Sequence, residues 1–288
     1  MDTIFQQISI IGLGLIGGSW GLAVKKYGPA ARRVGFGRAV TVRRALAAGS
    51  IDEGADDLGK AVRDADLIIL AAPVGAILDS FPKLKALAPS KALITDVGST
   101  KQIICQRARE TFGDELLFLG GHPLAGKEKA GVENADAALF KNARYVLTPL
   151  EERHLEDPRA KAFISLVTAV GAHPHIMNPA VHDHALAFFS HLPQLLSSGL
   201  ASLIAEENLK SELPLELAAS GFRDVTRLAE SPYSVWRDIC LTNTGDIQQA
   251  LELLIEKLEF VKQHLSDREL EHEFEQAGKL RQMLRKCH

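Results

Sequence analysis

Short apolar runs alternate with helix-like segments through the first half of the chain. Six of these runs are rich in strand-forming residues and end at Gly or Pro, which favours strands over buried helices of similar length. They are ISIIGLG (8–14), RVGFG (33–37), DLIILAAP (66–73), ALITDVG (92–98), LFLGGHP (117–123) and ARYVLTP (143–149). Strands alternating with helices in this way predict a parallel sheet wrapped by helices, an α/β domain.

The pattern changes near residue 177, where apolar residues begin to recur every three or four positions. One series runs from Val181 to Leu203, a second from Ile247 to Leu265 and a third from Leu270 to Leu284. This spacing is typical of amphipathic helices. We therefore expect two domains, residues 1–176 with an α/β fold and residues 177–288 all helical. The terminal stripes fit either a dimer interface or packing within one subunit.

Composition narrows the class of protein. The chain has 288 residues, 46% of them hydrophobic and 24% charged, which is the balance of a soluble globular protein. A formal net charge of -3 gives no broad basic field for nucleic acid. Three scattered cysteines suit a reducing cytoplasm. The first residues do not read as a signal peptide, and no long apolar run predicts a membrane span.

The stretch IGLGLIGGS predicts a dinucleotide site. Gly12, Gly14 and Gly17 form G-x-G-x-x-G between a predicted strand and a predicted helix. Gly12 permits the tight turn, Gly14 lets the backbone approach the pyrophosphate, and Gly17 lets the helix pack on the strand, with the helix N-terminus attracting the phosphates. A glycine-rich turn without a ligand is the alternative. Further candidate cofactor contacts are Leu15, Ile16 and Pro73.

An acidic residue about 20 positions later normally binds the adenosine ribose of NAD. This chain has Gly37 and Arg38 there. Without a carboxylate to repel it, a 2′-phosphate could be held by Arg38 with Arg43 or Arg44, which favours NADP and keeps NAD open. The alternative is that these arginines form a solvated helix face.

Two polar turns follow predicted strands, where ligands bind in open α/β sheets: DVGSTK (96–101) and GGHPLAGKEKAG (120–131). Ser99 either binds a ligand or caps the helix expected to begin near Thr100. His122 stands at a strand end beside glycines, and Pro123 restricts its backbone. This setting favours an imidazole presented to a ligand over one satisfied in the core.

The second domain adds HDHALAFFSHLPQ (182–194) and SGFRDVTRLAESPYSVWRDI (220–239). His182 and His184 point to different sides of a helix, about 200° apart, so no metal site is expected. Arg223 and Arg227 share a helix face and form a candidate anion clamp, with surface salt bridging as the alternative.

In series, GLGLIGGS, DVGSTK, GGHPLAGKEKAG, HDHALAFFSHLP and GFRDVTRLAESPYSVWRDI resemble the prephenate and arogenate dehydrogenase family over nearly the whole chain. The resemblance implies a Rossmann-like domain joined to a helical dimerisation domain, with the active site between them. It implies the following roles: His122 as the catalytic histidine, Ser99 as its partner at the substrate hydroxyl, Glu128 at the entrance, Arg227 on a substrate carboxylate, His191 in the substrate pocket, and Trp236 near the dimer and pocket boundary.

The implied reaction is oxidative decarboxylation of prephenate to 4-hydroxyphenylpyruvate in tyrosine biosynthesis, with hydride passing to NAD(P)+. A neutral His122 must accept the proton, so activity should rise with pH through about 6.5 unless neighbours shift the pKa. Gln194 stands where many prephenate-preferring members have a second histidine, which keeps arogenate or dual specificity open. More remote alternatives are a β-hydroxyacid dehydrogenase, which would need a lysine such as Lys210, and a non-catalytic NADPH-binding protein.

Overall fold

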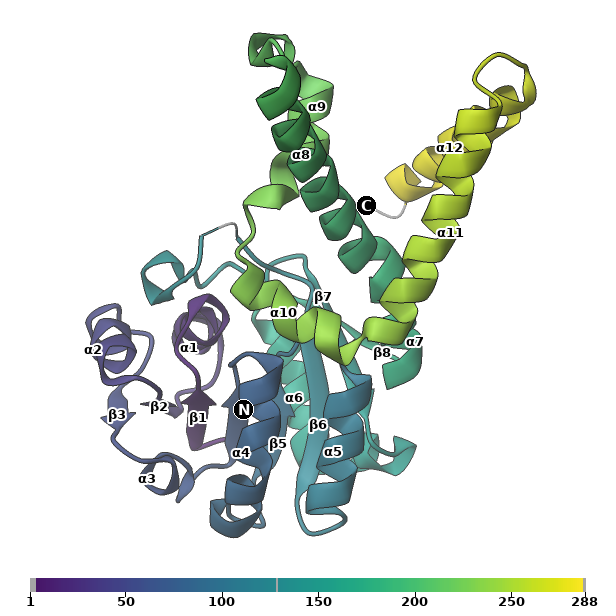
Figure 1. Cartoon of the computed structure of the whole chain (residues 1–288). Coiled ribbons are helices and arrows are strands. Elements are labelled where there is room, and N and C mark those ends of the chain that lie inside the picture. The colour runs from purple at the N-terminus through teal and green to yellow at the C-terminus, as the bar shows by residue number, and fades with distance from the viewer. Residues whose placement is uncertain (1–3, 128, 287–288) are drawn as a thin grey trace.

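Eight strands form one sheet in the order β3-β2-β1-β4-β5-β6-β7-β8 (Figure 1). The computed structural model describes residues 4–127 and 129–286. The strands are β1 (Gln7–Ile11), β2 (Arg32–Phe36), β3 (Glu53–Ala55), β4 (Leu67–Leu70), β5 (Leu93–Asp96), β6 (Leu117–Pro123), β7 (Arg144–Pro149) and β8 (His173–Ile176). The order from β3 to β6 is that of doubly wound dinucleotide-binding domains.

The predicted parallel sheet is confirmed from β3 to β6, and the prediction is wrong for β7. That strand runs antiparallel to β6, and β8 then runs parallel to β7. A parallel strand needs a long crossover, usually through a helix, to return to the same end of the sheet. The described part of the connection from β6 to β7 contains the short 3₁₀ helix η1 (Val132–Asn134) and no α-helix to form such a crossover.

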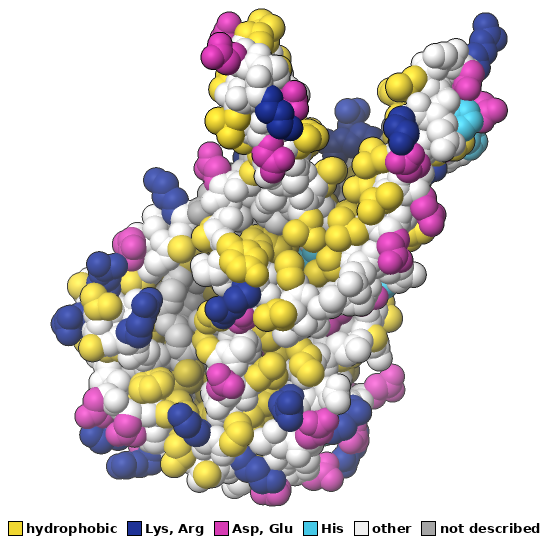
Figure 2. Space-filling model, in the orientation of Figure 1, with side chains coloured by type: hydrophobic (Ala, Val, Ile, Leu, Met, Phe, Trp, Pro, Cys, Tyr) yellow, Lys and Arg dark blue, Asp and Glu magenta, His cyan; other side chains and the backbone are white. Residues whose placement is uncertain are grey.

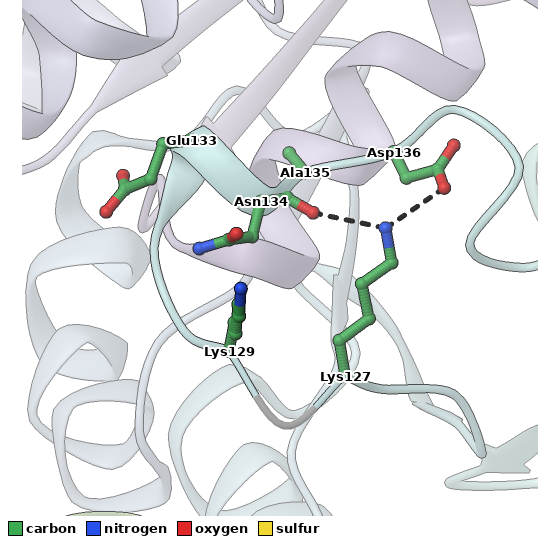
Figure 3. Close-up of a pocket in the computed structure, with 6 residues that line it drawn as sticks. All are labelled: Lys127, Lys129, Glu133, Asn134, Ala135 and Asp136. Carbon is green, nitrogen blue, oxygen red and sulfur yellow. Dashed lines mark hydrogen bonds and ion pairs between the residues drawn. The ribbon is translucent and has the colours of Figure 1, made fainter.

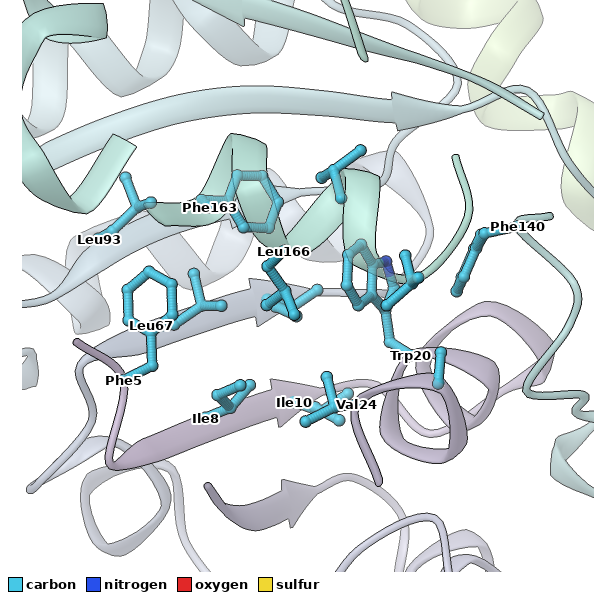
Figure 4. Packing of buried hydrophobic residues seen from close by; sticks show 14 of the residues in the cluster. Phe5, Ile8, Ile10, Trp20, Val24, Leu67, Leu93, Phe140, Phe163 and Leu166 are labelled. Carbon is cyan, nitrogen blue, oxygen red and sulfur yellow. The ribbon is translucent and has the colours of Figure 1, made fainter. Parts of the chain in front are cut away.

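Alternate strand residues fill cores on the two faces of the sheet. Leu67 and Ile69 enter one core with α1 and α6, and Ile68 and Leu70 enter the other with α4 and α5. Trp20 of α1 is completely buried in the first core (Figure 4). The helices of this domain are α1 (Leu15–Tyr27), α2 (Ala39–Ala47), α3 (Leu58–Val62), α4 (Val74–Leu87), α5 (Gln102–Phe112) and α6 (Pro158–Ala169).

The helical domain follows β8 and begins with one long, locally widened helix. Its helices are α7 (Pro179–Leu186), the π-helical turn η3 (Ala187–His191), α8 (Leu192–Ser211), α9 (Ser220–Thr226), the 3₁₀ turn η5 (Arg227–Glu230), α10 (Tyr233–Thr242), α11 (Thr244–Gln263) and α12 (Glu269–Lys286). Pro193 accounts for the widened turn, because a proline ring clashes with the carbonyl four residues earlier in a regular helix.

Two helical arms rise from the sheet domain, one made of α8 and α9 and the other of α11 and α12 (Figure 1). Figure 2 shows apolar side chains gathered at the base of the arms and along α11. Leu209 is 87% exposed and Phe274 is 77% exposed. Packing within one chain therefore leaves much of the predicted apolar stripes uncovered. No described helix is both long and apolar enough to cross a membrane.

Carboxylates of the helical domain close the first turns of two helices of the sheet domain. Asp238 of α10 accepts the amide of Gly75 in α4 at 3.0 Å. Asp183 of α7 accepts the amides of Lys101 and Gln102 at the start of α5, at 2.7 and 2.8 Å. A carboxylate at a helix N-terminus satisfies unpaired amides and complements the helix dipole. These contacts fix the two domains against each other.

We predict that Gly21→Ala destabilises the protein by about 1–3 kcal/mol, because α1 would have to move away from its neighbour. A Cβ at Gly21 would lie 2.0 Å from the carbonyl oxygen of Ser50. Urea denaturation measures the change. Gly245→Ala, in the first turn of α11 with nothing within 4 Å of the added carbon, is the matched control and should be neutral or stabilising. Wild-type stability of Gly21→Ala would contradict this packing.

Candidate active site

The turn between β1 and α1 has the shape of a pyrophosphate cradle. Gly12 has φ +97°, and a Cβ there would lie 2.3 Å from the carbonyl oxygen of Ala71 in the neighbouring chain segment. A Cβ at Gly17 would lie 1.9 Å from the Gly12 carbonyl oxygen, whereas a Cβ at Gly14 would meet nothing within 4 Å. Gly14 is the N-cap residue of α1, and no side chain caps this helix, which leaves its first amides to a ligand. These residues fit a dinucleotide phosphate.

The end of β2 lacks the carboxylate that would bind a ribose. Gly37 follows this strand, and Arg38 and Arg43 are exposed on or beside α2. Neither arginine forms an ion pair with a described residue. The other arginines of this region are held by carboxylates: Arg32 by Glu53, Arg33 by Asp52 and Arg44 by Glu133. Arg38 and Arg43 are thus the pair available to a phosphate. Pro73 precedes the first turn of α4.

The loop after β6 lies against the cofactor helix. A Cβ at Gly18 would lie 2.8 Å from the Val132 side chain and 3.0 Å from that of Ala135, so the second glycine of IGGS admits this loop. The Asp136 amide donates to the Ser19 hydroxyl at 2.9 Å. Residues that follow GGHPLAGKEKAG therefore pack against the helix that begins at the dinucleotide turn.

A hollow of about 480 Å³ opens on the outer side of this loop (Figure 3). Its lining residues are Lys127, Lys129, Glu133, Asn134, Ala135 and Asp136. The Lys127 ammonium lies 3.3 Å from the Asn134 carbonyl oxygen and 3.0 Å from the Asp136 carboxylate. Because the loop itself satisfies this cation, we assign the hollow no ligand. Glu128, predicted at the entrance, lies outside the described residues.

Both charged residues of DVGSTK are completely buried and paired with each other. The Asp96 carboxylate binds the Lys101 ammonium and accepts the amides of Gly98 at 2.7 Å and Gly121 at 3.1 Å. The same carboxylate thus ties the loop after β5 to the strand that carries His122.

Ser99 lies in this loop and is partly exposed. The helix that follows begins at Gln102, and the Asp183 carboxylate accepts its first amides. Capping, the alternative role considered for Ser99, is therefore wrong, because a residue of the other domain fills that role.

His122 contacts a histidine of the helical domain, and that histidine contacts an aspartate. Its Nδ1 lies 2.8 Å from Nε2 of His182, and Nδ1 of His182 lies 2.7 Å from Oδ1 of Asp183. His182 and Asp183 are 0% and 1% exposed, whereas His122 is partly exposed at the end of β6. The spacing of HDH argues against a metal site but does not reveal this contact, which the sequence-based prediction missed. His184 points away and contacts Asp246, as the predicted opposite faces require.

Burial lowers the pKa of the His122 imidazole well below its usual value. His182, the Lys101 ammonium and His191 lower it further, in that order. The titration near 6.5 expected for an unperturbed imidazole is thus displaced to lower pH. At neutral pH His122 is uncharged and able to accept a proton.

His191 and Gln194 lie deep in the helical domain beside this cluster. Burial lowers the pKa of His191 to about 4, so this histidine is neutral and does not attract a carboxylate by charge. Its Nδ1 lies 3.3 Å from Nδ2 of Asn243, and its ring meets that of Trp236 edge-on. The Gln194 amide Nε2 donates to the Leu228 carbonyl oxygen at 2.8 Å, which joins it to the turn that Arg227 begins.

The structure does not bring every candidate together. Arg223 is exposed on α9, and no described contact joins it to His122, His182 or His191. Lys210, the residue that a β-hydroxyacid dehydrogenase would need, lies near the end of α8 and pairs with Glu207 at 3.5 Å.

Within the described ranges, one group has the spacing of metal ligands: Asp114, Glu151 and His154 on the surface. The Arg153 guanidinium forms ion pairs with both carboxylates and already neutralises part of their charge. The group is remote in sequence from every motif above, and we assign it no metal.

Both halves of the chain match family models of one enzyme. Residues 20–176 match the nucleotide-binding domain of prephenate dehydrogenase, and residues 178–285 match its dimerization domain. The chain belongs to the prephenate dehydrogenase family.

Individual relatives agree with this membership. The chain is 35% identical over 281 residues to the prephenate dehydrogenase of Bacillus subtilis, covering 95% of this chain and 74% of the relative. It is 32% identical to the cyclohexadienyl dehydrogenase of Zymomonas mobilis, covering 99% and 98%. A crystal structure of prephenate dehydrogenase from Aquifex aeolicus, in complex with hydroxyphenyl propionate and NAD+, superimposes with a TM-score of 0.82 at 28% identity, covering 98% and 97%.

In this member of the prephenate dehydrogenase family, we predict that Asp96→Asn lowers the free energy of unfolding by about 3–5 kcal/mol, because it leaves the buried Lys101 ammonium without a counter-charge. Urea denaturation measures the loss. Asp56→Asn is the control, since it breaks an exposed pair with Lys60 and should leave the midpoint nearly unchanged. Equal midpoints for the two variants would contradict the role of the buried pair.

Proposed function

We propose that this chain catalyses the oxidative decarboxylation of prephenate to 4-hydroxyphenylpyruvate with hydride transfer to NAD(P)+, in tyrosine biosynthesis. The observation that carries the proposal is the partly exposed His122 imidazole at the carboxyl end of β6, which contacts the buried His182, itself bound to the buried Asp183. Its strand belongs to the same sheet as the glycine turn that fits a dinucleotide. Membership of the family supports the same reaction.

The chemistry needs one proton acceptor in this position. Prephenate carries a hydroxyl and a hydrogen on one ring carbon and a carboxylate across the ring. His122 draws the hydroxyl proton while the hydrogen leaves that carbon as hydride. The bond to the carboxylate then breaks, its electron pair completes the aromatic ring, carbon dioxide departs, and the proton returns to the phenol oxygen. A bound dinucleotide supplies the hydride acceptor.

Other residues hold the substrate in this proposal. We assign Ser99 to the reacting hydroxyl and Arg227 to a substrate carboxylate, where a charge-assisted pair contributes roughly 1.5–3 kcal/mol. His191 and Trp236 form a neutral, largely apolar wall, which suits the ring of the substrate. Arg223, on the exposed face of α9, stays a candidate for binding a substrate carboxylate.

For the cofactor we propose NADP, with NAD as the second candidate. With Gly37 at this position, no carboxylate binds the ribose hydroxyls of NAD or repels the 2′-phosphate of NADP. Arg38 and Arg43 have no described ion-pair partner. Two guanidinium groups without carboxylates suit a 2′-phosphate. The Aquifex aeolicus relative was crystallised with NAD+, which supports NAD as the second candidate.

Arogenate is a second candidate substrate, and Gln194 is the observation that favours it. Both described hydrogen bonds of its side chain use Nε2, which donates to the Ser198 hydroxyl and the Leu228 carbonyl oxygen. The remaining atom, Oε1, is an acceptor and suits the ammonium of arogenate better than the keto group of prephenate. The match to a cyclohexadienyl dehydrogenase supports acceptance of both substrates.

We further propose a homodimer formed through the helical domain, in the cytoplasm. The uncovered apolar faces of the arms and the match to a dimerization domain support the dimer. The free thiols of Cys105 and Cys240 suit a reducing compartment.

The purified protein should turn over prephenate when mixed with either dinucleotide, and faster with NADP+, as followed by the absorbance of the reduced form. Arogenate completes a two-by-two grid of substrates and dinucleotides. Arg38→Ala should raise the KM for NADP+ by about 10- to 100-fold while that for NAD+ changes little, because the lost guanidinium no longer pairs with the phosphate. Dinucleotide binding without turnover of either substrate would favour a non-catalytic protein instead.

The pH profile of kcat should stay flat through about pH 6.5 and fall only at lower pH, because the lowered pKa keeps His122 unprotonated until then. His122→Asn should reduce kcat by roughly 100- to 10,000-fold with dinucleotide binding preserved. Stopped-flow assays across pH measure both. An acid limb centred at the ordinary imidazole value, or full turnover by His122→Asn, would contradict the assignment.

A further inference from the structure

His122 has one described hydrogen-bond partner for its side chain, and that partner lies in the other domain. The contact joins Nδ1 of His122 to Nε2 of His182 at 2.8 Å, and the next joins Nδ1 of His182 to the Asp183 carboxylate at 2.7 Å. We propose that Asp183 and His182 act as positioning residues that fix the tautomer of His122, so that its Nε2 carries the lone pair that meets the substrate. The catalytic consequence rests on the proposed function.

The Asp183 carboxylate, at one end of the series, determines the direction of each hydrogen bond. An ionised carboxylate only accepts, so Nδ1 of His182 must carry the hydrogen. A neutral His182 then has a lone pair on Nε2 and accepts from Nδ1–H of His122. This leaves Nε2 of His122 unprotonated, which is the form that a proton acceptor needs. A carboxylate two rings away thus determines the state of the reacting atom.

Further hydrogen bonds hold the Asp183 carboxylate in place, so it stays the acceptor at the end of this series. Its Oδ1 also accepts the Lys101 amide at 2.7 Å and its Oδ2 accepts the Gln102 amide at 2.8 Å. The backbone carbonyl of Asp183 accepts Nδ2 of Asn243 at 2.9 Å. Capping α5 explains these amide contacts, but it does not require a histidine beside the aspartate. His182, completely buried between Asp183 and His122, is the residue that the capping role leaves unexplained.

Besides His182 of α7, the charged and titratable groups that face His122 do not compete for Nδ1. They are Lys101 from the start of α5 and His191 from η3. The Lys101 ammonium is a donor held by Asp96 and cannot accept a hydrogen. His191 instead has its Nδ1 next to Asn243. Only the His182 contact therefore selects between the two tautomers.

The tautomer is measured directly by two-bond ¹⁵N–¹H correlation NMR on histidine-labelled protein without substrate, since protonated and unprotonated ring nitrogens resonate far apart. The His122 signals are identified by their loss in His122→Asn. We expect wild-type His122 to carry its hydrogen on Nδ1. In His182→Phe the acceptor is lost and the Nε2–H form should become populated. In His182→Gln the amide oxygen can accept, and the Nδ1–H form should be retained.

The kcat values of the His182 variants should follow the population of the Nδ1–H tautomer of His122. His182→Phe should lower kcat by about 100- to 10,000-fold, the range seen when a catalytic histidine loses its orienting partner, with the KM for the dinucleotide changed less than about threefold. His182→Gln should recover activity to within about 10-fold of wild type. His184→Phe, on the exposed side of the same helix, is the matched control and should match wild type. Thermal unfolding shows whether each variant is folded.

An Nε2–H tautomer of His122 in the wild-type protein would overturn the proposal, as would wild-type kcat in folded His182→Phe. Equal loss of activity in folded His182→Gln and His182→Phe, with His122 remaining Nδ1–H in both, would also overturn it and indicate a packing role. The NMR result does not depend on the substrate. Absence of prephenate turnover in the wild-type protein would therefore refute the proposed function and leave the tautomer assignment to be judged by NMR.

Discussion

The Asp183 carboxylate is the contact on which the candidate site depends. It closes the first turn of α5 and binds His182, which in turn binds His122. Without the helical domain, the first amides of α5 would have no acceptor and His122 would have no described partner. The sheet domain therefore presents a reactive imidazole, and the helical domain completes both its surroundings and the helix beside it. Separate domains would each leave polar groups unsatisfied, which favours their packing as one unit.

Close backbone packing brings the other parts within reach. A Cβ at Gly121 would lie 2.6 Å from the backbone oxygen of Asp96, so this glycine allows β6 to approach β5. Gly18 admits the loop that follows β6 onto the cofactor helix in the same way. Glycines in two separate motifs thus serve one purpose, which is to bring the dinucleotide turn, the buried ion pair and His122 to one end of the sheet. Larger residues would hold these segments apart.

Much of the fold could be predicted from the sequence, because periodicity records which face of an element is buried. Six strands, the glycine turn and the helical second half follow from pattern alone. The strand β3 has only three residues, and β8 reads HPHI, so neither leaves an apolar run to detect. The site was only partly predictable. His122 stood out by its position at a strand end, but its partner His182 lies 60 residues away, and no local spacing reveals that contact. The lowered pKa of His122 likewise depends on burial and on Lys101, whose burial no local pattern in the sequence indicates.

The order of residues in the series His122, His182 and Asp183 resolves two opposing needs of a proton acceptor. A carboxylate in direct contact with His122 would fix its tautomer and would also favour the charged imidazolium, raising its pKa. Placing His182 between them passes on the hydrogen-bond direction while keeping the negative charge one ring further from the reacting group. The Lys101 ammonium acts in the same direction, because it favours the neutral imidazole. The site thereby obtains a base that is oriented by an aspartate and remains uncharged, because the aspartate and the base do not touch.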